Sequence, residues 1–329
     1  MMMRRDIYLF SNGRLMRKDN TLYIVSEDGI KRAVPVEQVE NVHLFGQIDL
    51  NSALFNFSGQ KEVMLHFYNY YGFYTGSFYP REHSVSGIVT VKQSDHYLRK
   101  EKRLFLAKCF VQSASFHMLR TCRKRGIHGY ESVQIITELS KNIRDAKDVQ
   151  QTMGIEGMIR QHYYRALNEL IPEEFTFAER TKRPPRDPFN ALISFGNTMM
   201  YTSVLSEIYK TQLNPTISYL HEPSQKRFSL CLDLAEIFKP LLVDPLLITL
   251  VNKKKITSKH FENHDGMVYL NEMGRKIVIA AFDERLQQTI RHRKLKRNVS
   301  YWYLIRLECY KLIKHVIGDT PYIPLKAWW

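Results

Sequence analysis

Three residue groups, far apart in the chain, place acidic or imidazole side chains within apolar or helical stretches. They are Gly154-Ile155-Glu156-Gly157, Tyr219-Leu220-His221-Glu222-Pro223 and Asp233-Leu234-Ala235-Glu236. Charge that is buried without a partner is costly, so such groups are usually paired or hold a metal. Jointly they offer carboxylate oxygens and one imidazole nitrogen, a donor set suited to Mg²⁺ or Mn²⁺. Because the set contains no thiolate, a dedicated zinc or copper site is disfavoured.

The first group lies beside the apolar stripe of a predicted helix. Gly154 and Gly157 flank Glu156 and would let another backbone or a ligand approach the helix closely. The simpler alternative is a partly exposed glutamate that forms an ion pair with Arg160, one helical turn later.

The other two groups also have simpler interpretations. His221 could be a hydrogen-bonded structural histidine. Its neighbours do not form the HExxH motif of zinc proteases, because Gln225 occupies the place of the second histidine. Asp233 and Glu236 are three residues apart and share one face of a predicted helix. They could merely favour the helix dipole, with Lys239 as the ion-pair partner of Glu236.

The net charge is the most unusual bulk property of the chain. The 329 residues carry a net charge of +15, yet residues 1–80 contain eight basic and eight acidic residues, so the excess lies entirely beyond them. We therefore expect a polyanionic partner, with nucleic acid the leading candidate and an anionic membrane surface the second. No apolar run is long enough to span a membrane, and the N-terminus does not resemble a signal peptide. Four widely separated cysteines indicate reduced core thiols and a cytoplasmic protein.

The residue patterning predicts an α+β protein of two domains. Residues 1–80 form the predicted N-terminal β-sheet or sandwich domain, with strands rich in β-branched and aromatic residues near 6–10, 22–25 and 63–68. A linker is predicted at 81–90, followed by an all-α C-terminal domain over 91–329, where apolar residues recur at helical spacing. Helices are expected near 104–126, 131–145, 147–170, 188–211, 244–252, 272–290 and 298–317.

Clusters of basic residues are confined to the predicted helical domain. We predict DNA binding by Arg123, Lys124, Arg125, Arg293, Lys294 and Lys296. One such cluster is usually just a solvated surface, whereas several outside a neutral region suggest salt-sensitive phosphate contacts that are independent of base sequence. The chain has no Walker-type phosphate loop and no dinucleotide fingerprint, so nothing indicates nucleotide-driven chemistry.

The order of these motifs is similar to that of a known family. Asn190–Asn197, His221, Leu232–Pro240 and Asp244, preceded by the Glu156 group, resemble the core integrase of CRISPR spacer acquisition. The ladder of Val34, Pro35, Val36, Val39, Val42 and Gly46 resembles the β region of the same family. The resemblance covers nearly the whole chain.

The resemblance implies a β domain for dimerisation, a helical catalytic and DNA-binding domain, and a homodimer. It also implies that two integrase dimers are bridged by one dimer of a smaller adaptation protein and act on double-stranded and branched DNA. Glu156, His221 and Glu236 match the family's catalytic metal ligands. Asp233 and Lys239 match supporting positions near them.

These expectations together predict a metal-dependent DNA endonuclease and integrase. It would insert foreign DNA fragments as new spacers into a CRISPR array by transesterification with a 3′-hydroxyl. The alternative is a non-catalytic nucleic-acid-binding scaffold of the adaptation complex. A metal hydrolase of small substrates is disfavoured by the charge of +15.

Overall fold

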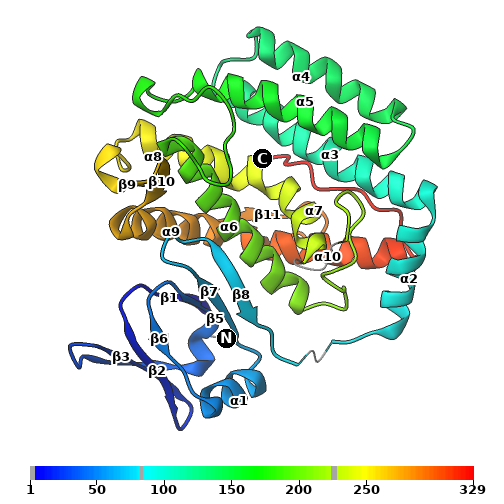
Figure 1. Cartoon of the computed structure of the whole chain (residues 1–329). Helices are drawn as coiled ribbons and strands as arrows, with labels where there is room; N and C mark the ends of the chain where they lie inside the picture. The colour runs from blue at the N-terminus through cyan, green and yellow to red at the C-terminus, as the bar shows by residue number, and fades with distance from the viewer. Residues whose placement is uncertain (1–3, 82–83, 224–227) are drawn as a thin grey trace. The chain divides into compact units, whose positions relative to one another are not determined.

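The computed structural model describes residues 4–81, 84–223 and 228–329 (Figure 1). The chain forms two compact units, Met1–His83 and Ser84–Trp329. Strands dominate the first unit and helices the second, so the predicted α+β fold class is confirmed.

Two four-stranded sheets build the first unit. Their strands are β1 Arg5–Leu9, β2 Gly13–Lys18, β3 Thr21–Ser26, β4 Lys31–Pro35, β5 Val39–Leu44, β6 Ile48–Asp49, β7 Met64–Tyr68 and β8 Tyr74–Phe78. One sheet has the order β1-β5-β7-β8 and the other β4-β3-β2-β6. In the first sheet β1, β5 and β7 are parallel and β8 is antiparallel to β7. In the second, β2, β3 and β4 form an antiparallel meander and β6 is parallel to β2.

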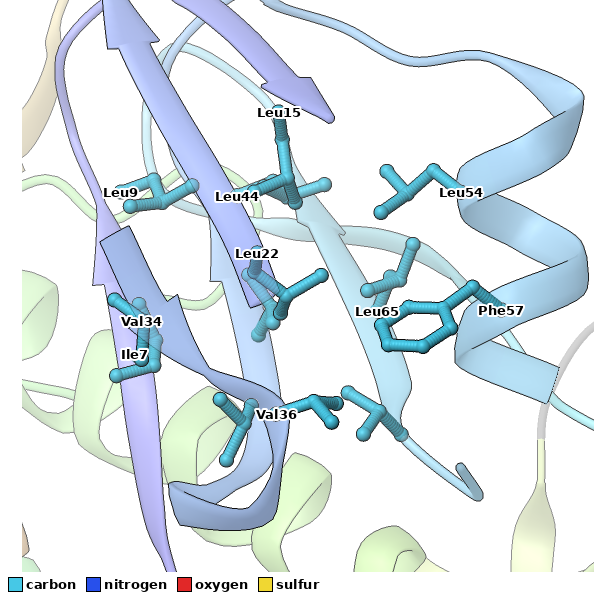
Figure 2. Close-up of a cluster of buried hydrophobic side chains, with 13 residues drawn as sticks. Ile7, Leu9, Leu15, Leu22, Val34, Val36, Leu44, Leu54, Phe57 and Leu65 are labelled. Carbon is cyan, nitrogen blue, oxygen red and sulfur yellow. The ribbon is translucent and has the colours of Figure 1, made fainter. Parts of the chain in front are cut away.

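The core of the first unit joins residues of both sheets with α1, which spans Ser52–Gln60 (Figure 2). Its buried members include Ile7, Leu9, Val42, Leu44 and Leu65 of the first sheet, Leu15, Leu22 and Val34 of the second, and Leu54 and Phe57 of α1. Alternate residues of β1 and β5 belong to this core, as the period of a strand requires. The ladder residue Gly46 is needed for close approach, because an added Cβ would lie 2.6 Å from the carbonyl oxygens of Phe10 and Ser11.

The second unit is built from helices of unequal length. They are α2 Gly87–Leu98, α3 Lys100–Lys124, α4 Glu131–Asn142, α5 Val149–Asn168, α6 Pro188–Tyr209, α7 Ser229–Phe238, α8 Asp244–Asn252, α9 Glu272–Gln287 and α10 Tyr301–Val316. A π-helical turn, η4 at Lys239–Val243, joins α7 to α8. Every helix expected from the apolar spacing is present, within a few residues at each end.

Three features of the second unit differ from the prediction. α2 begins at Gly87, inside the predicted linker, because Ser86 Oγ accepts the Val89 backbone N–H and caps the helix. Two antiparallel hairpins interrupt the helical domain, β9 Phe261–His264 with β10 Met267–Leu270 and β11 Thr289–Arg291 with β12 Asn298–Ser300. The end of the helix predicted at 272–290 is therefore strand β11, and the start of the helix predicted at 298–317 is strand β12. Thr289, Ile290 and Val299 of this hairpin are β-branched, which favours strands.

Helix packing in the second unit brings distant segments together. In Figure 1 α3, α4 and α5 run side by side, and α7 also packs against α3. α6 packs against α7 and η4 at very short range, since an added Cβ at Gly196 would lie 2.6 Å from Val243 Cγ1. The four cysteines are buried and free, as predicted. Within the described residues, no helix is long and apolar enough to cross a membrane.

Candidate active site

Two of the three predicted metal ligands meet across two helices of the second unit. Glu156 lies on α5 and Glu236 on α7. The guanidinium of Arg160 joins them, because its Nε pairs with Glu156 Oε1 and its Nη2 pairs with Glu236 Oε2. Lys239 Nζ lies 2.8 Å from Glu236 Oε1. The two local ion pairs expected as simpler alternatives are both present, and the contact of Arg160 with Glu236 joins them into one cluster.

Burial and charge oppose each other in this cluster. Burial is the largest single influence on the pKa of Glu156 and raises it, but Arg160, by its charge and its hydrogen bond, acts together with His221 and Lys239 to lower the pKa overall. Burial and the nearby Arg160 charge lower the pKa of Lys239 to about 8. Burial raises the pKa of Asp244, the first residue of α8, to about 6, although Arg160 and a hydrogen bond from Tyr163 act against burial. Anionic and cationic groups are thus packed together with little water between them.

His221 is held in place by Asp233. The Asp233 carboxylate is fully buried and accepts backbone N–H groups of Tyr219, Leu220 and His221 at 2.6, 3.0 and 3.0 Å. Its Oδ1 also lies 2.8 Å from His221 Nδ1. Because an ionised carboxylate only accepts hydrogen bonds, Nδ1 carries a proton, and the lone pair of the neutral ring is on Nε2. Glu156 also interacts electrostatically with His221.

The segment around His221 is anchored by residues of α2 and α3. Arg103 donates from Nε to the Tyr219 carbonyl at 2.9 Å and from Nη2 to Glu222 at 2.6 Å. Tyr97 donates its hydroxyl to the same Glu222 carboxylate at 2.9 Å. Glu222 is therefore a structural residue, in agreement with the rejected HExxH interpretation. Gln225 lies outside the described residues.

A second set of cations, Arg180 and Lys182, which the sequence gives only as one of several basic clusters, interacts electrostatically with the residues of the site. Arg180 donates to Asn190 Oδ1 at 2.9 Å and to Ser194 Oγ at 2.8 Å, which explains two polar residues of the Asn190–Asn197 motif. Burial lowers the pKa of Lys182, and the nearby charges of Arg160 and Arg180 lower it further. In the sequence this loop looked like any solvated basic cluster, because its approach to Glu156 depends on packing.

The donors of the cluster suit a divalent cation in their chemistry. Two carboxylates already share one cation, and the imidazole beside them has a nitrogen lone pair directed away from Asp233. Among residues 4–81, 84–223 and 228–329, no three acidic, histidine or cysteine side chains form a complete metal-binding site. The structure therefore joins Glu156 and Glu236 through Arg160, and His221 is a separate donor that interacts electrostatically with Glu156.

Comparison with known proteins gives the family. The model for CRISPR associated protein Cas1 matches residues 7–284. The chain belongs to the Cas1 family. A CRISPR-associated endonuclease Cas1 of Thermodesulfovibrio yellowstonii is 54% identical over 325 residues, which cover 99% of this chain and 100% of the relative. The resemblance read from the motifs is thus confirmed.

Solved structures agree with this assignment. A CAS1 protein from Thermotoga maritima is 39% identical, with a TM-score of 0.90 over 98% of this chain and 100% of that chain. A casposase bound to integration product is 18% identical and has a TM-score of 0.89 over 97% and 92% of the two chains. At that identity the casposase shows only that the fold is shared.

Of the two roles predicted for the glycines of the acidic helix, close approach of another backbone is not found among the described residues, and approach of a ligand stays a prediction. An added Cβ at Gly154 or Gly157 would meet no heavy atom of the described residues within 4 Å. Both glycines are exposed, so no backbone approaches the helix there. The surface of α5 at Gly154 and Gly157, beside Glu156, is therefore open.

The predicted DNA-binding residues at the end of α3 differ in their surroundings. Arg123 is exposed. Lys124 Nζ lies 3.3 Å from the Trp329 carbonyl oxygen. Arg125 is half-buried and donates to the Pro245 carbonyl at 3.0 Å, so it stabilises the packing of α3 on α8. Of these three residues, Arg123 is the most accessible to DNA.

The other predicted DNA-binding residues lie in the loop of the β11–β12 hairpin. Lys294 and Lys296 are exposed, and the Arg293 guanidinium stacks over the Trp328 ring at 5.4 Å. Lys296 has a φ of +55°, which fits its place in a tight loop. The loop of the hairpin therefore presents exposed basic side chains.

Proposed function

We propose that this member of the Cas1 family is a divalent-metal-dependent DNA endonuclease and integrase. The observation that carries the proposal is the joining of Glu156 and Glu236 across α5 and α7, with His221 held nearby by Asp233. Support comes also from the printed name of the relative that is 54% identical, a CRISPR-associated endonuclease. The cations Arg180 and Lys182 beside the carboxylates suit an anionic phosphodiester substrate.

Glu156, Glu236 and Nε2 of His221 would hold Mg²⁺ or Mn²⁺. A bound divalent ion would offset the charge on a non-bridging phosphate oxygen and align the attacking hydroxyl. Asp233 sets the tautomer and direction of the imidazole, and Lys239 balances the charge of Glu236. In phosphoryl transfer the protein contributes mainly positioning and charge stabilisation, which these residues would supply. With a DNA 3′-hydroxyl as nucleophile the reaction is spacer integration, and with water it is cleavage.

The assembly is part of the same proposal. Residues 1–80, which belong to the first unit, would form the homodimer contact, and residues 91–329 would carry catalysis and DNA binding. Two such dimers would be bridged by one dimer of a smaller adaptation protein on double-stranded and branched DNA. The four free, buried cysteines support an intracellular, cytoplasmic setting for this assembly.

The test is strand joining and cleavage of branched DNA with Mn²⁺, with and without a chelator. Glu156→Gln, Glu236→Gln and His221→Ala should each lower joining by about 100-fold or more, because each removes a group that stabilises charge in the transition state. Duplex affinity, measured by fluorescence anisotropy, should change little. Glu138→Gln is the matched control, since Glu138 is 69% exposed and pairs with Lys141 on the surface of α4.

Two results would overturn the proposal. Joining that is unchanged in all three variants would remove the site assignment. A wild-type protein that binds branched DNA but neither cleaves nor joins it with Mn²⁺ would instead be the non-catalytic scaffold.

A further inference from the structure

Arg160 has a more central position than a surface partner of Glu156. Its guanidinium pairs with carboxylate oxygens of both Glu156 and Glu236, which belong to different helices. The side chains of Arg160, Glu156 and Glu236 are only 17%, 19% and 8% exposed. In such a setting two carboxylates repel strongly unless a cation lies between them.

Arg160 engages one oxygen of each carboxylate. Glu156 Oε1 and Glu236 Oε2 both pair with the same guanidinium, so one planar cation spans the space between the helices. The other oxygen of Glu236, Oε1, is bound by Lys239 at 2.8 Å. Glu236 would therefore retain one cationic partner if Arg160 withdrew.

Arg160 also has an alternative acceptor close by. Tyr164, one turn further along α5, forms a hydrogen bond with Arg160, and this bond supports the positive charge of the guanidinium. A guanidinium has five N–H donors, so it can release one carboxylate and keep its remaining bonds. The side chain is thus held by partners that do not all depend on the carboxylates.

We propose that Arg160 is the resident counter-ion of the metal site, and that a divalent cation enters by displacing its guanidinium from Glu156 and Glu236. The proposal rests on the proposed function, because it takes these two carboxylates as metal ligands. Arg160 then acts as a positioning residue with two effects. It keeps the two carboxylates together before metal binds, and it weakens metal affinity by competing for the same oxygens.

The experiment is a Mn²⁺ titration of the full-length protein by isothermal titration calorimetry. Arg160→Gln removes the competing charge and should bind Mn²⁺ about tenfold more tightly than wild type. Arg160→Lys keeps the charge on a single ammonium that lacks the planar fork, so its affinity should lie between those of the other two proteins. The control is Arg165→Gln, because Arg165 is an exposed arginine on the same helix and its loss should change affinity less than twofold.

Thermal unfolding gives a second readout that does not depend on activity. Without metal, Arg160→Gln should melt below wild type, because two enclosed carboxylates lose their shared cation. Added Mn²⁺ should raise the melting temperature of Arg160→Gln more than that of wild type. If the glutamine variant folds only with Mn²⁺, that dependence supports the exchange, and Arg160→Lys supplies the affinity comparison.

The outcomes separate this proposal from the proposed function. If neither wild type nor Arg160→Gln binds Mn²⁺, the metal site itself is wrong. If both bind Mn²⁺ with equal affinity, or the glutamine variant binds it more weakly, the metal site stands and the counter-ion exchange is wrong.

Discussion

Each unit of the protein contains a histidine paired with a buried aspartate, and the two pairs differ in what surrounds them. In the first unit His43 Nε2 lies 3.2 Å from Asp6, and its Nδ1 lies 2.8 Å from the Tyr68 hydroxyl. In the second unit His221 Nδ1 lies 2.8 Å from Asp233, and its Nε2 has no hydrogen-bond partner among the described residues. The His43 side chain is 1% exposed and the His221 side chain is 28% exposed.

The difference teaches which feature separates a structural pair from a candidate site. Both imidazoles are oriented by a carboxylate, so the pair itself carries no functional information. His43 uses both ring nitrogens within the sheet, which leaves no lone pair for a ligand. His221 keeps one nitrogen without a hydrogen-bond partner among the described residues, and it interacts electrostatically with Glu156.

We expect the largest effect when the imidazoles of His221 and His43 are removed in turn, which tests the comparison of the two pairs directly. His221→Ala should lower strand joining by about 10²- to 10³-fold with little loss of stability. His43→Ala removes one hydrogen-bond partner each of buried Asp6 and Tyr68 and the packing of the ring itself, so it should lower the free energy of unfolding by about 2–3 kcal/mol. Joining assays and urea denaturation on both variants check this. A large loss of joining in folded His43→Ala would show that the two pairs do not differ in role.

The next effect concerns the two aspartates. Asp233→Asn replaces one acceptor oxygen by an NH₂ group that faces N–H donors, so His221 should lose its orientation and joining should fall about 10- to 100-fold. Asp6→Asn should change stability but not the rate of joining per folded molecule. Single-turnover joining, normalised to the folded fraction from circular dichroism, distinguishes these outcomes. Equal loss in both variants would mean that Asp233 is merely structural.

A third histidine, His117, extends the comparison to stability at different pH. Its Nδ1 lies 3.0 Å from the Ile237 carbonyl oxygen, and its Nε2 accepts the Ala327 N–H at 3.1 Å. Burial lowers its pKa to about 3, so the folded protein requires the neutral ring. The stabilisation is complete above pH 6.5 and is lost as pH falls toward 3, by about 2 kcal/mol at pH 5.

Comparison of wild type with His117→Gln isolates this contribution. The difference in their free energies of unfolding should shrink by about 2 kcal/mol between pH 7 and pH 5. Urea denaturation at the two pH values measures it. A constant difference would contradict the assigned role of the neutral ring.

The smallest effect sharpens the contrast between the neutral first unit and the basic second unit. Lys294→Glu and Lys296→Glu should each weaken duplex binding several-fold, and each should lower the salt slope of affinity by about 1, because a phosphate contact is lost. The control is Lys18→Glu, because Lys18 is also an exposed lysine but lies on β2 of the first unit. Fluorescence anisotropy between low and moderate salt gives the slopes. Equal slopes in all four proteins would remove the hairpin from the DNA-binding surface.

Much of the fold could be predicted from local patterns. Apolar spacing located α3, α5 and α6, and aromatic and β-branched runs located β1, β3 and β7. The strands β2 and β5 were missed because Arg14, Arg17, Glu40 and Asn41 break the strand pattern, and only pairing with neighbouring strands compensates. The hairpin of β11 and β12 was missed for a similar reason, since its loop is as basic as a helix end.

Part of the candidate site could also be predicted from local patterns in the sequence, and part of it could not. Glu156 with Arg160 and Glu236 with Lys239 follow from helical spacing, and both pairs are present. The role of Asp233 is visible only in space, because it depends on a bend that turns three backbone N–H groups toward one carboxylate. The interaction of Lys182 with the charges of Arg160 and Glu156 could likewise not be predicted from a cluster of basic loop residues.

The sequence by itself determined the family, the fold class and the residue types available for chemistry. It also determined which charged side chains share a helix face, because a helix has a constant period. Only the tertiary structure decided that α5 and α7 pack on the same helix, α3, and that Arg160 thereby joins Glu156 to Glu236. The reason is physical: a contact such as that of Arg160 with Glu236, which are 76 positions apart, is set by how buried apolar surfaces pack, and no local pattern encodes that geometry.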